Sequence, residues 1–290
     1  MKITFKDDKI LTLGGKTFSL VPTKYNVNIS QVQNGTITSD KQTAFAGETI
    51  TLSYTADTGY DLQYFTVNGI QIVGNKFTMP SRSVTVSGSF ADMYNPYNLP
   101  NKTLRVKVID GFVPSVGEAS YTLVDEDENI YDVYSNSNDW SGVNTNSWKV
   151  ILGGNLSTVT TLPRLEYASN LIRIESLDLS GATDLNYFLN NNTTIESVKN
   201  INTTNITNMY SAFNGCTSLK KLPMFDVSKV TLAIYTFRNC INAETGIIDM
   251  YQVLSNKSIS VQKHISTFTN CGTSTTTGAA ELAQIPSDWK

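Results

Sequence analysis

Residues able to do acid–base chemistry are scarce in this sequence. His264 is the only histidine among 290 residues, so any Ser-His-Asp, Cys-His or histidine-based metal arrangement would have to be built around it. We expect a structural histidine, solvated or hydrogen-bonded. A glycan-cleaving enzyme would need paired carboxylates in a cleft, whereas the adjacent Asp125 and Glu126 lie in an expected turn. No P-loop, GxGxxG, GxSxG or HExxH motif occurs, and we predict a non-enzymatic protein without a cofactor.

Metal ligands are also poorly spaced. Cys216, Cys240 and Cys271 match no C-x2-C zinc pattern, and an odd number of cysteines argues against a disulfide framework. Asp125, Asp127 and Asn129 imitate the first half of a calcium loop. The sixth position of that loop is isoleucine instead of glycine, and the twelfth is asparagine instead of glutamate. We therefore predict a solvated hairpin turn there and no metal site.

Aromatic side chains are the remaining candidates for binding. Tyr131, Tyr134, Trp140 and Trp148 lie close together in the sequence among asparagines and aspartates. Exposed rings with such neighbours commonly hold the faces of sugars. We take Tyr131, Tyr134 and Trp140 as candidate ligand contacts. Packing in the core of a β domain explains these residues equally well, because the alternation in IYDVY would bury some of them.

Composition favours a β-rich fold and excludes two kinds of partner. The 22 Lys and Arg residues nearly balance 25 Asp and Glu residues without a long run of either sign, so we expect no nucleic-acid binding. Only 16% of residues are charged, while Asn, Thr and Ser are abundant, as turn-rich β proteins require. No apolar stretch approaches 18 residues, so we expect no membrane insertion.

An internal repeat organises the C-terminal half. Three 24-residue blocks align without a gap: residues 169–192, 193–216 and 217–240. Each has apolar residues at columns three, six and nine, which we expect to point inward. The second half of each block has apolar residues at helical spacing, which predicts a short helix. Stacked blocks would bury one continuous core, giving a mainly β fold with short helices and a C-terminal solenoid.

A Phe-x-x-Cys pattern closes the later blocks. It comprises Phe213, Cys216, Phe237, Cys240, Phe268 and Cys271, the last pair closing a fourth unit of 31 residues that carries an insertion from residue 241. The first block ends in Asn192 instead. We expect the cysteines to be small buried side chains in the stack, with thiol pKa values raised at the C-terminal ends of the predicted helices. A disulfide between Cys216 and Cys240 is the alternative.

The blocks resemble the surface-antigen (BspA-like) leucine-rich repeats of bacterial surface proteins and mycoplasma lipoproteins. The segment NMYSAFNGCTSLKKLPMFDVSKVT is especially similar to that repeat unit, and the resemblance covers roughly residues 165–271. It implies a curved solenoid that serves adhesion or recognition, and it implies no catalytic residue.

A separate small β domain is expected upstream. YNVNISQVQ and TITSD are joined by Asn34-Gly35, which predicts a hairpin between them. Residues from Gly47-Glu48 through Gly59-Tyr60 to Phe90 follow the order of internalin-type B-repeats. This resemblance, over about 70 residues, implies a spacer or stalk of the kind found on cell surfaces and phage fibres.

We divide the chain into five segments. These are residues 1–22, an N-terminal hairpin that docks the chain; 23–92, the B-repeat-like domain; 93–102, a linker rich in proline and asparagine; 103–164, a β cap; and 165–290, the solenoid with its C-terminal cap.

The sequence start, MKITFKDDKILTL, has no apolar h-region and no small-residue cleavage site, although the modules resemble those displayed outside cells. A bacteriophage virion protein reconciles these features, because it is released by lysis. We expect a fibre, baseplate, tail-associated or head-decoration component. Its partners would be other virion proteins through the N-terminal segment, and a host-surface protein or glycan through the solenoid or cap. We also expect a homo-oligomer or multi-copy assembly, and the alternative is a bacterial cell-surface adhesin.

Overall fold

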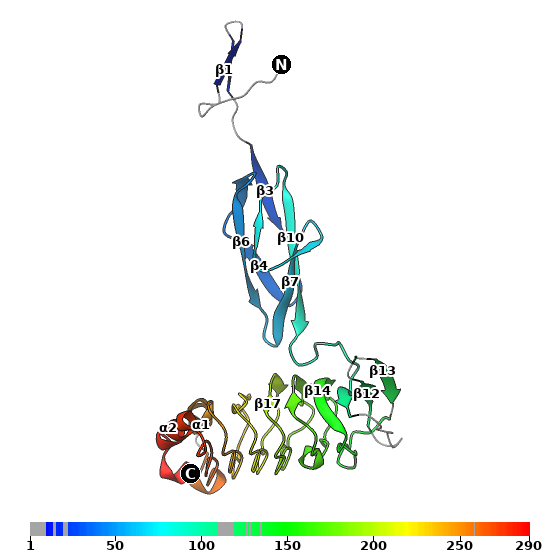
Figure 1. Cartoon of the computed structure of the whole chain (residues 1–290), viewed down its shortest axis with the longest axis vertical. Helices are drawn as coiled ribbons and strands as arrows, with labels where there is room; N and C mark the ends of the chain where they lie inside the picture. Colours follow the sequence, from blue (N-terminus) through cyan, green and yellow to red (C-terminus); the bar gives the residue numbers. More distant parts are fainter. Residues whose placement is uncertain are drawn as a thin grey trace. The chain divides into compact units, whose positions relative to one another are not determined.

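The computed structural model describes residues 10–13, 16–19, 23–109, 119–125, 127, 129–133, 135–257 and 259–290. The chain divides into two compact units, Met1–Asp92 and Met93–Lys290, which are described separately (Figure 1). Within the described residues the fold is mainly β, with α-helices only at Ile247–Ser255 (α1) and Thr276–Ala283 (α2), as composition predicts.

The first unit begins with a short antiparallel pair, β1 (Ile10–Leu13) and β2 (Lys16–Ser19). Eight further strands follow: β3 (Lys24–Ile29), β4 (Gly35–Ser39), β5 (Thr43–Phe45), β6 (Thr49–Ala56), β7 (Tyr60–Val67), β8 (Ile70–Ile72), β9 (Lys76–Thr78) and β10 (Val84–Asp92). They form two sheets, ordered β5-β3-β10-β7-β8 and β4-β6-β9. Fully buried Ile50 and Leu52 from β6 pack in one core with residues of the other sheet, such as Phe65 and Val86.

The predicted hairpin across Asn34-Gly35 is wrong. Strand β3 pairs with β5 and β10, whereas β4 pairs with β6, so the two strands belong to different sheets. Asn34 does take the left-handed conformation, with φ of 65°. Gly35 is needed for a close approach, because a Cβ atom there would lie 2.6 Å from the Phe90 ring and 2.8 Å from the Thr55 carbonyl oxygen. The Asn34-Gly35 pair therefore lies where the chain passes from one sheet to the other.

The second unit opens with four longer strands: β11 (Thr103–Val108), β12 (Tyr121–Val124), β13 (Ile130–Val133) and β14 (Trp148–Asn155). Strand β14 pairs antiparallel with β11 on one side and parallel with the first repeat strands on the other. Residues 93–102, expected to be a linker, lie against β14, since the Lys102 N–H donates to the Asn155 carbonyl at 2.7 Å.

Short strands repeat along the C-terminal part. They are β15 (Arg173–Ile174), β16 (Leu177–Asp178), β17 (Ser197–Val198) and β18 (Ile201–Asn202), and each pairs in parallel with its counterpart 24 residues away. Isolated bridges continue the register between Asp184, Asn208 and Leu232. Figure 1 shows the successive blocks side by side, from β14 to α1 and α2. The 24-residue sequence period is thus the period of backbone pairing.

The second halves of the blocks are not helices, and this prediction is wrong. In residues 185–192 alternate N–H groups bond to the next block, as Tyr187 does to the Tyr210 carbonyl and Leu189 to the Ala212 carbonyl. The intervening N–H groups bond to the carbonyl three residues back and close β-turns. Such turns also place every third or fourth residue on one side, which mimics helical spacing. Left-handed φ values at Tyr187 and Asn191, both 56°, prevent a continuous helix.

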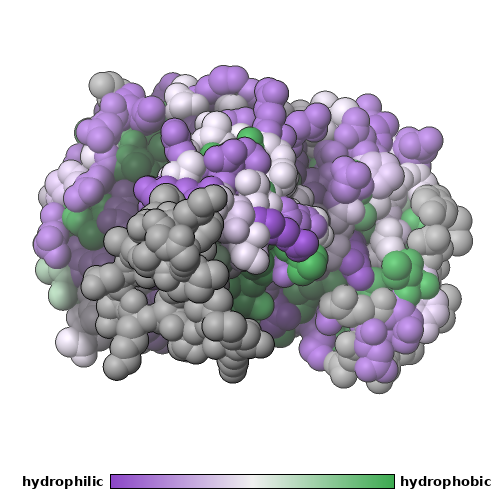
Figure 2. Space-filling model, turned by 90° about the horizontal axis from the view of Figure 1, so that it is seen from above, coloured by the Kyte–Doolittle hydropathy of each residue, from purple (hydrophilic) through white to green (hydrophobic). Residues whose placement is uncertain are grey.

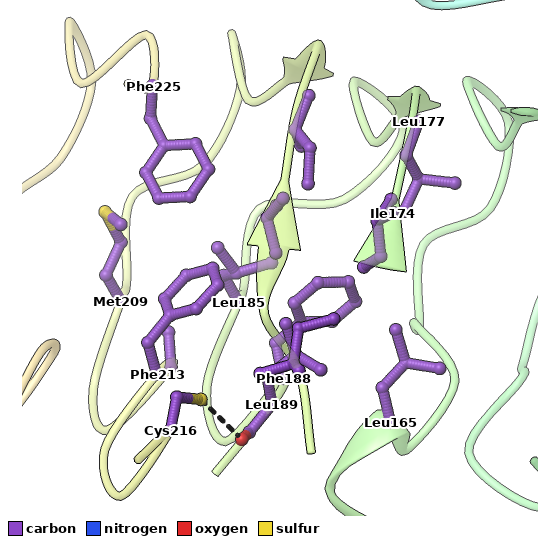
Figure 3. Close-up of a cluster of buried hydrophobic side chains, with 14 of the residues drawn as sticks. Leu165, Ile174, Leu177, Leu185, Phe188, Leu189, Met209, Phe213, Cys216 and Phe225 are labelled. Carbon is purple, nitrogen blue, oxygen red and sulfur yellow. Dashed lines mark hydrogen bonds between the residues drawn. The ribbon is translucent and has the colours of Figure 1, made fainter. Parts of the chain in front are cut away.

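A phenylalanine stack occupies the core of the blocks. Phe213, Phe225 and Phe237 contact one another, with the Phe213 centroid 5.3 and 5.4 Å from the other two and those two 6.4 Å apart. Phe237 also stacks on Phe268 at 5.8 Å. In the first block, the aliphatic side chains of Ile174 and Leu177 point inward and belong to the same core cluster (Figure 3). One core cluster extends from Leu104 in β11 to Trp289, so neighbouring blocks share a continuous apolar interior.

The 31-residue fourth unit contains helix α1, and α2 packs beside it. The Glu281 carboxylate of α2 accepts from the backbone N–H groups of Ile247 and Ile248, at 2.8 and 3.2 Å. It supplies the cap that Gly246 lacks at the α1 N-terminus. The short 3-10 helices lie at Leu165–Tyr167 (η1), Val261–Lys263 (η2) and Ser287–Trp289 (η3).

Candidate ligand-recognition face

The candidate aromatic contacts do not form a cluster on the surface. Trp140 is fully buried in the core of the second unit, so its prediction as a ligand contact is wrong. Its indole N–H donates to the Ser137 carbonyl, and Trp148 is likewise buried, with its ring against Tyr121. Tyr131 is 57% exposed on β13. Tyr134 lies outside the described residues.

The calcium-like segment forms a turn between β12 and β13. Both carboxylate oxygens of Asp125 accept from Asn129, one from its backbone N–H at 2.9 Å and one from its side-chain amide at 2.7 Å. These bonds hold the pKa of Asp125 below its ordinary value. No group of three metal-ligating side chains occurs in the part of the chain that the structure describes.

His264 is buried, with 3% of its surface exposed. Its ring stacks on Trp289 at a centroid distance of 3.8 Å, and Nε2 lies 3.9 Å from an Asp288 carboxylate oxygen. Among the described residues, no serine hydroxyl or cysteine thiol forms a hydrogen bond with the His264 ring. This histidine therefore contacts two residues of the C-terminal η3 segment.

The three cysteines are buried free thiols, one above another in successive blocks. The Cys216 thiol donates to the Leu189 carbonyl at 3.2 Å, as Figure 3 shows, and Cys240 donates to the Phe213 carbonyl at 3.1 Å. Burial raises the pKa of the Cys216 and Cys271 thiols well above the usual range. Since the predicted helices are absent, desolvation and not a helix dipole is the cause.

In the first block, Asn192 occupies the position of the later cysteines and donates a hydrogen bond to the equivalent carbonyl. Its amide donates to the Leu165 carbonyl at 3.1 Å, also 27 residues back, and to the Ala168 carbonyl at 3.0 Å. Its carbonyl oxygen accepts from the backbone N–H groups of Thr194 and Ile195. Asparagine in place of cysteine therefore bonds three additional backbone groups: the Ala168 carbonyl next to η1, and the Thr194 and Ile195 N–H groups.

A stripe of tyrosines crosses three blocks on the turn side. The rings of Tyr187 and Tyr210 meet edge to face with centroids 5.4 Å apart, and those of Tyr210 and Tyr235 at 5.9 Å. Tyr187 is 42% exposed and the other two are partly exposed. Arg238 extends the row, with its guanidinium carbon 5.1 Å from the centre of the Tyr235 ring. We call these three tyrosines the tyrosine stripe.

Left-handed backbone positions occur in each turn that carries a tyrosine of the stripe. Tyr187 and Tyr235 occupy left-handed positions, with φ of 56° and 57°, and the residue after Tyr210, Ser211, has φ of 53°. The parallel bonds between blocks hold these strained conformations in register. Partial desolvation and the adjacent Tyr210 hydroxyl raise the pKa of Tyr187, so its phenol stays neutral at neutral pH.

A polar pocket of about 340 Å³ opens at the Tyr187 end of the stripe. One wall comes from residues 160–166 and the other from residues 184–188, with Ser141 beside them. Its charged groups are Arg164, Glu166 and Asp184, and an Arg164 guanidinium nitrogen lies 3.0 Å from a Glu166 carboxylate oxygen. Because the charges of Arg164 and Glu166 cancel, Asp184 gives the pocket one net negative charge. We call this hollow the stripe pocket.

A second, larger hollow of about 660 Å³ lies over the strand side of the blocks. Its floor is formed by residues 196–201 and 220–226, and Met93 and Tyr94 contribute to its lining. Its lining is more apolar, and it contains no row of rings. Hydrophilic side chains dominate the surface seen in Figure 2, with hydrophobic ones in scattered patches. The tyrosine stripe with its pocket is therefore the best-organised candidate site.

Sequence reasoning missed this site because it predicted a short helix in the second half of each block, where all three tyrosines lie. The usable signal is the spacing of Tyr187, Tyr210 and Tyr235, which differ by 23 and 25 residues, close to the repeat period. A residue type that recurs near the period of a stack must lie in a row across it.

Two segments match known protein families. Residues 25–93 match the model described as a divergent InlB B-repeat domain, and residues 155–273 match the model described as a Mycoplasma protein of unknown function, DUF285. Both domains are of types found in surface proteins, so the chain carries modules typical of a surface-associated repeat protein. Comparisons with characterised proteins and with solved structures found no match. None of the helices in the described residues has the length and apolarity that a membrane span requires.

Proposed function

We propose that the protein is a non-enzymatic binding protein displayed on a biological surface, whose C-terminal blocks form a leucine-rich-repeat solenoid that contacts its ligand through the tyrosine stripe. The observation that carries the proposal is the row of mutually contacting rings across three blocks. Tyrosines give large contact areas with few torsions to immobilise, and the shared core holds them rigidly. The inward-pointing side chains of the blocks pack in the core.

For the setting, we propose a bacteriophage virion, in a fibre, baseplate, tail-associated or head-decoration component present in several copies. The N-terminal segment would join it to other virion proteins. The second candidate is a bacterial cell-surface adhesin, which the two family matches fit equally well. Mass spectrometry of purified virions, with surface labelling of intact bacteria beside it, separates the two. Detection on cells and absence from virions would overturn the virion setting.

Binding is tested with the purified chain and whole cells of a panel of bacterial strains. The Tyr187→Ala, Tyr210→Ala and Tyr235→Ala changes combined should abolish saturable binding to a recognised strain. The matched control is Tyr64→Ala, which removes a 37% exposed tyrosine from the first unit and should change nothing. Undiminished binding by the triple variant would reject the stripe as the site. Release of soluble sugar from the cells would contradict the non-enzymatic assignment.

A further inference from the structure

The stripe pocket differs from the rest of the recognition face in its polar groups. Beyond the Arg164–Glu166 pair it is lined by Ser141, Thr160, Thr161, Asp184 and Asn186, and Tyr187 and Phe188 belong to its aromatic side. The Asn186 carboxamide is exposed and makes no side-chain hydrogen bond among the described residues. The hydroxyls of Thr160 and Thr161 are likewise exposed and without a partner there. These donors and acceptors are free for a ligand.

The carboxylate of Asp184 is held in a defined orientation. One oxygen accepts from the Asn186 backbone N–H at 2.7 Å, and the other accepts from the Asn208 side-chain amide of the next block at 3.1 Å. Each oxygen retains a second lone pair. On the opposite wall, the salt bridge to Arg164 orients Glu166, whose side chain is only 12% exposed. Two fixed carboxylates therefore face a hollow that also has an aromatic wall.

We propose that the stripe pocket binds a neutral sugar unit of a surface glycan, which rests on the proposed function and specifies its ligand. Vicinal sugar hydroxyls both donate and accept, so they match carboxylate oxygens, a carboxamide and hydroxyls held on two walls. The less polar face of the ring packs on Tyr187. The volume of about 340 Å³ is near the lower end of the usual range for ligand pockets, about 300–1,000 Å³, and suits one or two sugar rings.

Charge decides which sugars fit. Arg164 is neutralised by Glu166, and Asp184 gives the pocket one net negative charge, so a uronic or sialic acid would be repelled. The next units of the glycan then extend over Tyr210 and Tyr235. One sugar in the pocket and further rings along the stripe make a single extended binding site.

The test is calorimetric titration of the full chain with neutral hexasaccharides of glucose, mannose, galactose and N-acetylglucosamine. Oligouronates serve as the acidic comparison. We expect saturable binding of a neutral oligosaccharide, weakened about fivefold or more by Asn186→Ala, as loss of one good hydrogen bond requires. The control is Asn256→Ala, an exposed asparagine at the end of α1, which should leave the affinity unchanged.

Three results would overturn the proposal: oligouronates binding more tightly than neutral chains, neutral binding that is unchanged by both Asn186→Ala and Tyr187→Ala, or no binding by any oligosaccharide. If no oligosaccharide binds while the chain still attaches to cells through Tyr210 and Tyr235, the sugar pocket is rejected and the proposed function stands. If the unmodified chain attached to cells of no strain in the panel, the proposed function itself would be rejected.

Discussion

At the scale of single residues, the molecule depends on one acceptor position repeated from block to block. The Leu189 and Phe213 carbonyls accept from Cys216 and Cys240, and the equivalent Leu165 carbonyl accepts from Asn192. All three donors are buried, and each gives its carbonyl a second partner beside a backbone N–H group. Asn192 contributes more than the cysteines, because its side-chain oxygen also accepts from the Thr194 and Ile195 N–H groups.

We predict that Asn192→Ala lowers the free energy of unfolding by about 1–3 kcal/mol, because it leaves the buried Ile195 N–H without its partner. The control is Asn170→Ala, which removes a bond of the same kind, to the Asn146 carbonyl at 2.7 Å, but at an exposed position. Urea denaturation followed by circular dichroism measures both. Equal losses in the two variants would contradict a special role for Asn192.

The thiols give a second prediction at this scale. All three cysteines are fully buried, and burial raises the pKa of Cys216 and Cys271, so the folded protein should react slowly with an aromatic disulfide reagent at pH 8. After unfolding in guanidinium, three sulfhydryls should react at the rate of free cysteine. A titre of one would reveal a Cys216–Cys240 disulfide, the alternative left open by the sequence.

At the scale of elements, hydrogen bonds between blocks replace helices. The spacing of Leu185, Phe188 and Leu189 is compatible with a helix and with successive β-turns. Only pairing with the next block selects the turns. The same non-local selection separates β3 from β4, where Asn34-Gly35 would locally favour a hairpin.

The contact between α1 and α2 is also testable. We predict that Glu281→Ala destabilises the second unit by about 0.5–2 kcal/mol, since it removes the cap of the α1 N-terminus. Glu244→Ala, at an exposed position just before α1, is the control and should cost little. Amide hydrogen exchange in residues 247–255 should quicken in the first variant only. Unchanged exchange there would show that α1 needs no help from α2.

What the sequence predicts correctly is the part that repeats. The inward positions Leu171, Ile174 and Leu177 are buried, and the buried closures at Phe213 and Cys216 follow from the same alignment. Trp140 shows the limit of this approach, because an aromatic residue among asparagines has the same local sequence whether it is exposed or in the core. The stripe pocket could not be predicted, since its walls, residues 160–166 and 184–188, meet only when blocks stack.

At the scale of the whole molecule, the chain consists of two compact units with separate cores, Met1–Asp92 and Met93–Lys290. The first has an ordinary two-sheet core, whereas the second gains stability by sharing one core along the stacked blocks. We propose that each folds on its own, so that damage to one core leaves the other intact.

Scanning calorimetry should therefore resolve two transitions. Phe213→Ala removes a fully buried ring and should cost about 3–5 kcal/mol, which lowers the transition of the second unit by roughly 10 °C. The transition of the first unit should stay in place. A single transition that moves as a whole would contradict independent folding.

We propose that recognition takes place on the tyrosine stripe. Hydrogen–deuterium exchange of the full chain, with and without envelope fragments from a recognised strain, tests it most directly. We predict slower exchange on binding in residues 184–188, 208–212 and 232–238, which contain the stripe and one wall of its pocket, and no change around exposed Tyr131. Protection confined to residues 129–133, or to the strand-side hollow at residues 196–201 and 220–226, would contradict it.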